Sequence, residues 1–70
     1  MREVAIRDDS IRLGQLLKLA DLVEDGLEAK RLIADGAVRV NGETEVRRGR
    51  QLRHQDIVTV GSSSVRVVSD

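Results

Sequence analysis

The hydrophobic core of this chain can contain only aliphatic side chains. Its 70 residues include no Phe, Tyr, Trp or Cys, although 40% of them are apolar. A chain of this length buries only roughly 60% of the surface that its unfolded form exposes, so it supports one small core. We therefore expect residues 1–70 to form a single domain around a thin core of Leu, Ile, Val and Ala.

The same composition limits other kinds of site. Without Cys there is neither a disulfide nor a thiolate metal site, and nothing indicates an oxidising compartment. The first ten residues carry five charges, and no segment approaches the roughly 20 apolar residues of a membrane span. We expect a cytoplasmic protein that has no membrane segment and needs no cofactor.

A strand and two helices are predicted in the first half. Val4 and Ile6 alternate as in a short strand, which ends before Ser10. Ser10 is a good N-cap, and the helical spacing of Leu13, Leu16, Leu17 and Ala20 predicts a helix over residues 11–23. A variant capping box, Asp25 with Glu28, predicts a second helix over residues 26–35, ended by Gly36. With a connection of only one or two residues, the helices would turn sharply and pack together.

Strands are predicted from residue 37 onward, where apolar residues recur at every second position. Val38 and Val40 precede Asn41-Gly42, a strong signal for a tight hairpin turn. Val46 and Leu52 are expected to point inward on either side of a loop at residues 47–50, and further strands are predicted at residues 57–60 and 65–68. The predicted fold class is α+β, in the order β-α-α-β-β-β-β, with two short packed helices followed by a small, mostly antiparallel sheet.

The net charge is zero, but the basic residues are concentrated in the middle of the chain. Residues 30–53 hold seven basic and three acidic groups, whereas residues 1–29 hold four basic and seven acidic groups. Clustered Arg can mark a nucleic-acid-binding face, because the planar guanidinium contacts two phosphate oxygens at once, although a solvated surface of uneven charge is the simpler alternative. The hairpin arginines have only Glu43 and Glu45 as local counter-charges, so we expect an external anion.

The candidate nucleic-acid contacts are the outward-facing cations of both helices and of the hairpin. At 100° per residue, Lys18 points outward from the first helix, with Arg12 at its edge. The set includes Asn41, although its role in the turn is a sufficient explanation for that residue. The candidates are Arg12, Lys18, Lys30, Arg31, Arg39, Asn41, Arg47, Arg48, Arg50 and Arg53.

One stretch of the chain resembles a known family. It contains Arg12-Leu13, then the run Ala29-Lys30-Arg31-Leu32-Ile33-Ala34-Asp35-Gly36-Ala37-Val38-Arg39-Val40-Asn41-Gly42, and then Asp56-Ile57-Val58. Over about residues 11–60 this pattern resembles the S-four RNA-binding domain, named after a small-subunit ribosomal protein. The resemblance implies an αL RNA-binding motif, in which two helices and a hairpin hold an RNA backbone. It also implies a free-standing, non-catalytic bacterial protein that binds ribosomal or tRNA-like RNA, with the ribosome itself as a candidate partner.

The resemblance implies that four cations contact RNA, because they occupy positions at which the family has basic residues. These are Arg12, Lys30, Arg31 and Arg47. Three positions depart from the family pattern: Asp25-Gly26 replaces a frequent Ser-Arg, Gly14 replaces an acid, and Gln55 replaces the usual Gly. Because the helix-two Arg is missing, Arg48 and Arg50 are candidates to compensate for it.

Other functions fit the sequence less well. A protein-interaction module that docks an acidic partner is the main alternative, and the neutral net charge favours it. Duplex DNA binding lacks a recognition helix with Asn or Gln flanked by Arg. An enzyme or a zinc site is not expected, because the single histidine, His54, lies in a polar turn and no paired inward carboxylates are present. Without aromatic residues to stack on bases, the expected target is folded or double-stranded RNA, bound by a monomer.

Overall fold

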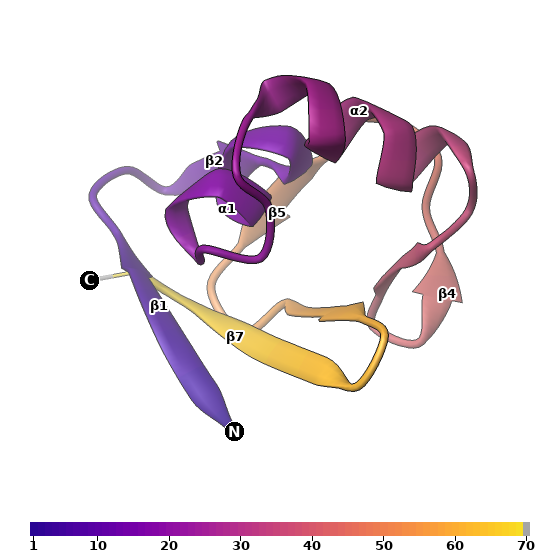
Figure 1. Ribbon diagram of the computed structural model, residues 1–70. Coiled ribbons are helices and arrows are strands. Elements are labelled where there is room, and N and C mark those ends of the chain that lie inside the picture. The colour runs from indigo at the N-terminus through magenta and orange to yellow at the C-terminus, as the bar shows by residue number, and fades with distance from the viewer. Residues whose placement is uncertain (70) are drawn as a thin grey trace.

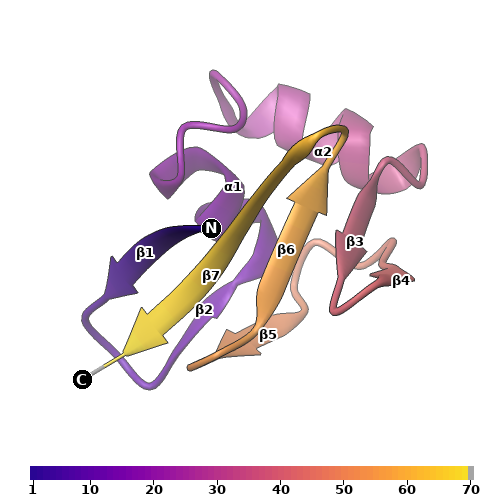
Figure 2. The ribbon, with the colours of Figure 1, turned by 90° about the horizontal axis from the view of Figure 1, so that it is seen from below.

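Two helices cover one face of a five-stranded sheet in the computed structural model, which describes residues 1–69 (Figure 1, Figure 2). The sheet has the order β1-β7-β6-β3-β4, and only the β1–β7 pair is parallel. Its strands are β1 (Arg2–Ile6), β3 (Val38–Val40), β4 (Glu43–Thr44), β6 (Ile57–Val60) and β7 (Ser63–Ser69). The first and the last strand therefore lie side by side.

A second, two-stranded sheet lies next to the first helix. It pairs β2 (Ser10–Arg12) with β5 (Gln51–Arg53) in antiparallel register, with Ile11 opposite Leu52. Helix α1 (Leu13–Leu19) begins directly after β2, and helix α2 (Gly26–Ala34) follows after a six-residue connection. This small sheet thus joins the start of α1 to the segment that follows the arginine-rich loop.

The core is entirely aliphatic, as predicted. Alternation along β3 turns Val38 and Val40 inward and Arg39 outward, and β6 and β7 contribute inward valines in the same way. Full burial of each such side chain contributes about 1.5–3 kcal/mol. The buried apolar residues are Val4, Ile6, Leu13, Leu16, Leu17, Ala20, Val23, Ala29, Ile33, Val38, Val40, Leu52, Val58, Val65 and Val67.

The predictions for helix two and for the hairpin turn are confirmed. The Asp25 carboxylate accepts a hydrogen bond from the backbone N–H of Glu28 at 2.9 Å and caps α2. Gly36 has φ +77° just after the C-cap, where the left-handed conformation ends the helix. Asn41 and Gly42 both have positive φ, of 52° and 86°, as the tight turn between β3 and β4 requires.

The prediction for helix one is wrong at both ends. Ser10 is not an N-cap: it belongs to β2, and its hydroxyl donates to the Gln51 side chain at 2.8 Å. The helix ends at Leu19 rather than at Val23, because Asp21 adopts φ +61° and the N–H of Leu22 bonds to the carbonyl of Leu17. The connection to α2 is therefore longer than the one or two residues expected.

Two further expectations are corrected. Val46 does not point inward, since 60% of its surface is exposed, whereas Leu52 is fully buried as predicted. The element order gains two strands: β2 precedes α1, which the sequence did not indicate, and five strands rather than the predicted four follow α2. The α+β class, the packed helix pair and the mostly antiparallel sheet are confirmed.

Truncation of a core leucine should destabilise the protein far more than truncation of its exposed neighbour on α1. Leu16 has no exposed surface, whereas Leu19 is 54% exposed. We expect Leu16→Ala to lower the free energy of unfolding by about 2–5 kcal/mol, because it removes buried contacts and leaves a cavity. Leu19→Ala should change it by no more than about 0.5 kcal/mol. Urea denaturation measures both, and equal losses would contradict the packing described here.

Candidate functional site

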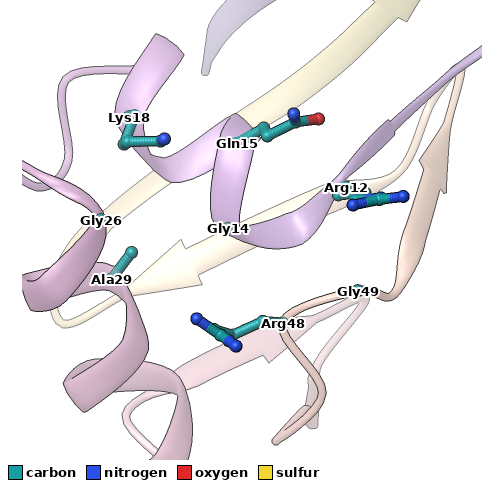
Figure 3. A pocket seen from close by; sticks show the side chains of 8 residues that line it. All are labelled: Arg12, Gly14, Gln15, Lys18, Gly26, Ala29, Arg48 and Gly49. Carbon is teal, nitrogen blue, oxygen red and sulfur yellow. The ribbon is translucent and has the colours of Figure 1, made fainter.

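An open cleft lies between α1, α2 and the arginine-rich loop at residues 47–50 (Figure 3). Its volume is about 330 Å³. The lining residues, referred to below as the basic cleft, are Arg12, Gly14, Gln15, Lys18, Gly26, Ala29, Arg48 and Gly49. Three of them are cations, and no acidic residue lines the cleft within the described part of the chain. The cleft is therefore suited to an anionic ligand.

Backbone hydrogen bonds hold the arginine-rich loop against the start of α1. The N–H groups of Leu13 and Gly14 donate to the carbonyl oxygens of Arg50 and Arg48, at 2.9 and 3.1 Å. The first N–H groups of a helix have no partner within the helix, so the loop replaces a side-chain cap, and Arg12 at the N-cap position supplies none. These two bonds fix Arg48 beside α1, although it is 34 positions from Gly14 in the sequence.

Lys18 reaches from α1 towards the first residue of α2. A Cβ atom built on Gly26 would lie 4.0 Å from the Lys18 ammonium. Because Gly26 has no side chain, the space beside α2 at this position stays open, and the Lys18 ammonium lies at its edge. Lys18 therefore places a cation of α1 next to the position at which the family often has an Arg.

Glu45 is a buried carboxylate that organises the loop. It is 6% exposed and accepts hydrogen bonds from the backbone N–H groups of Val46 and Arg47, both at 3.1 Å. Its oxygens also accept from Arg47 Nε at 3.0 Å, Arg47 Nη2 at 3.1 Å and Arg50 Nη1 at 2.9 Å. The hydrogen bonds from Arg47, and then those from Arg50, lower the pKa of Glu45 to about 2, against the opposing effect of its burial. In turn, Glu45 raises the pKa of Arg47.

These bonds correct one expectation about the hairpin. Five arginines near the loop were expected to need an external anion, yet Arg47 and Arg50 already share an internal carboxylate. No ion pair engages Arg12, Lys18 or Arg48 within residues 1–69. The cations of the basic cleft are therefore open to an external anion.

Two other cations of the predicted set lie on elements next to the basic cleft. Arg53 and Arg12 lie on the same outward face of the two-stranded sheet, opposite Ser10 and Gln51 respectively. Lys30 is exposed and lies one turn beyond Gly26 on the same face of α2. The structure therefore brings Arg12, Lys18 and Arg48 together, whereas Lys30 and Arg53 are exposed outside the lining of the cleft.

The remaining predicted contacts lie elsewhere or are already engaged. Arg31 lines a separate hollow on α2 together with Asp25, Glu28 and Asp35. Arg39 is exposed on β3, between the buried Val38 and Val40, and does not line the cleft. The Asn41 amide donates to Asp56 at 3.1 Å and accepts from the N–H of Ile57 at 2.9 Å, so both of its polar atoms have partners.

The sequence interpretation missed two residues of this region. Gln15 lines the basic cleft because it lies three positions before Lys18 on α1, a spacing that shares one helix face. Glu45 was considered only as a counter-charge, because its burial depends on the course of the loop. Spacing could have indicated Gln15, but no local signal could have indicated Glu45.

Other types of site have no support among the described residues. Within residues 1–69, no group of three or more His, Asp or Glu side chains is arranged to hold a metal ion. In the same part of the chain, no helix has the length and apolar character that crossing a membrane requires.

Comparison with known proteins identifies the family. The sequence pattern of the S4 domain matches residues 4–68. The chain belongs to the S4 domain family. A curated S4 relative, the probable ribosome maturation protein RlbA of Bacillus subtilis (strain 168), is 42% identical over 67 residues, which cover 94% of each protein. The S-four resemblance is thereby confirmed.

Two further proteins share parts of this S4 domain. Tyrosine–tRNA ligase 2 of Pseudoalteromonas translucida (strain TAC 125) is 49% identical over 43 residues, which cover 61% of this chain and 11% of the ligase. The crystal structure of the 30S ribosomal protein S4e from Thermoplasma acidophilum matches with a TM-score of 0.68 and 30% identity. That match covers 90% of this chain but only 33% of the ribosomal protein.

The S4 domain departures noted in the sequence have structural explanations. Gln55, where the family usually has Gly, has φ +81°, so a residue with a side chain holds the conformation that favours glycine. Gly14, where the family has an acid, lies against the loop: a Cβ there would be 3.8 Å from the Arg48 carbonyl oxygen. Its backbone contact with the loop does not depend on a side chain.

The stability of this S4 domain should fall as the pH is lowered from about 4.5 towards 2. Glu45 has an ordinary pKa of 4.5 and a pKa of about 2 in the folded protein, so in this range the unfolded chain binds the proton more readily. The contribution of Glu45 is therefore complete above pH 4.5 and is lost in acid. Urea midpoints measured across this range should fall more steeply for the native protein than for Glu45→Gln. Parallel curves would contradict this assignment.

Proposed function

We propose that this protein binds structured RNA through the basic cleft and catalyses no reaction. The observation that carries the proposal is the convergence of Arg12, Lys18 and Arg48 on one open cleft without an acidic lining residue in the described chain. Arg48 lies 30 positions from Lys18 and 36 from Arg12 in the sequence, so their meeting is a property of the fold. A polyanion with closely spaced phosphates is the ligand class that such a surface fits.

The proposed mechanism is recognition of phosphate and of RNA shape. Arg12, Arg48 and Arg53 can each offer a planar guanidinium to two phosphate oxygens, and Lys18 and Lys30 add point charges. Without any aromatic residue, the surface cannot stack bases in the way that single-strand binders do. Each phosphate contact contributes about −0.7 to −0.9 to the slope of log affinity against log salt concentration. Four to six contacts would therefore give a slope of roughly −3 to −5.

The family relationship supports this function and narrows the RNA. Membership of the S4 domain family and relatives named as a ribosome maturation protein and a 30S ribosomal protein support ribosomal RNA or a ribosomal particle as the partner. The partial match to a tyrosine–tRNA ligase keeps tRNA-like RNA as the second candidate. On the same grounds we propose that residues 1–70 act as one non-enzymatic domain in the cytoplasm, as a monomer.

The alternative function is docking of an acidic protein on the same cationic surface. The zero net charge favours it, because long-range attraction to RNA is then weak. Affinity purification with and without nuclease treatment separates the two functions. Loss of the ribosomal partners after nuclease treatment is expected for RNA binding, whereas retention of an acidic protein would favour the alternative.

A pair of matched double variants tests the basic cleft. Arg12→Gln with Arg48→Gln should make the salt slope for a double-stranded RNA hairpin shallower by about 1.5, because two phosphate contacts are lost. Arg31→Gln with Arg39→Gln removes the same charge from exposed positions outside the cleft and should leave the slope nearly unchanged. Fluorescence anisotropy at several salt concentrations measures the slopes, and thermal unfolding checks the fold. Equal slopes for both variants would overturn the proposed surface.

A further inference from the structure

The arginine-rich loop carries three guanidinium groups in two different states. Arg47 and Arg50 both turn to the Glu45 carboxylate. Arg48 instead turns into the basic cleft, as Figure 3 shows. No ion pair holds Arg48 within residues 1–69, and its carbonyl oxygen is fixed by Gly14. The loop thus separates its arginines although they lie within four consecutive positions of the sequence.

Arg47 and Arg50 both spend guanidinium donors on the Glu45 carboxylate. Arg47 donates from both Nε and Nη2 to the two oxygens of Glu45, so one of the two guanidinium edges that can bind an oxyanion bidentately is occupied and its charge is balanced. Arg50 donates from Nη1 to the same carboxylate, and only 30% of its side chain is exposed. The Arg47 side chain remains 73% exposed, so its engagement with Glu45 rather than burial limits what it can bind.

Glu45 is a persistent partner for these arginines. It is the single buried charged residue within residues 1–69, and side-chain and backbone donors saturate its oxygens. Its pKa of about 2 means that it stays ionised at any pH near neutrality. A buried carboxylate that is ionised and fully bonded keeps its partners, because loss of either partner leaves an uncompensated charge.

We propose that Glu45 is a specificity-determining residue that withholds Arg47 and Arg50 from RNA, so that the loop presents Arg48 alone. The inference rests on the proposed RNA-binding function. Three free arginines in four positions would bind any phosphate chain, because that attraction depends on charge and not on sequence or shape. Pairing two of them inside the loop leaves one guanidinium at a defined position, where only an RNA whose backbone fits the cleft can also reach Arg12 and Lys18.

The first test removes the whole ion network. The triple variant Glu45→Gln, Arg47→Gln, Arg50→Gln leaves no unpaired buried charge, and its thermal unfolding is measured as a check of the fold. We expect its salt slope for the double-stranded RNA hairpin to stay within about 0.5 of the native value, because two withheld arginines make no phosphate contact. A slope shallower by about 1.5, like that of Arg12→Gln with Arg48→Gln, would show that Arg47 and Arg50 grip the RNA and would overturn the inference.

The second test releases the two arginines. Glu45→Gln removes the carboxylate, and Glu43→Gln is the matched control, since Glu43 is exposed on β4 and has no ion pair within the described residues. We expect a salt slope steeper by about 0.7–1.5 for Glu45→Gln than for Glu43→Gln, together with tighter binding to an unstructured polyuridine. Equal slopes would overturn the inference. If neither the native protein nor any variant binds RNA, the proposed function itself fails.

Discussion

The pairing of residues 10–14 with residues 48–53 is the interaction on which the rest of the structure depends. The β2–β5 ladder and the two N–H bonds from Leu13 and Gly14 give α1 its starting point. They also bring the arginine-rich loop to the side of the helix pair, where the basic cleft forms. Because the bonded groups belong to the backbone, this arrangement does not depend on any one side chain in the loop.

The distribution of charge explains how a protein of zero net charge can carry a cationic site. No acidic residue lines the basic cleft within residues 1–69, and Asp25, Glu28 and Asp35 share a separate hollow on α2 with Arg31. Glu45 differs from these, since it lies within the cationic region and is buried there. Its two ion pairs take local charge out of contact with a ligand, while Arg48 remains outside them.

Membership of the S4 domain family accounts for the fold and leaves the details of the surface to this chain. The family's Arg at the start of α2 is Gly26 here, and Lys18 borders the space that a side chain at that position would fill. Lys18 therefore places a cation of the basic cleft next to position 26.

The sequence by itself determined the features that depend on neighbouring residues. Asp25 and Gly36 set the two ends of helix two, and Asn41-Gly42 form the hairpin turn. The alternation of Val38 and Val40 sets the inward face of β3. Each of these features depends on hydrogen bonds or dihedral angles within a few positions. Only the tertiary structure decided that Ser10 joins a strand instead of capping a helix, that Asp21 ends α1 without a glycine, and that Arg48 rather than Arg47 or Arg50 faces the cleft. The place of Ser10 depends on contacts between the start of α1 and the loop, and the direction of Arg48 depends on those contacts and on the burial of Glu45. Such contacts leave no periodic signal in the sequence. The end of α1 depends on a left-handed Asp, which local propensity does not distinguish from a helical one.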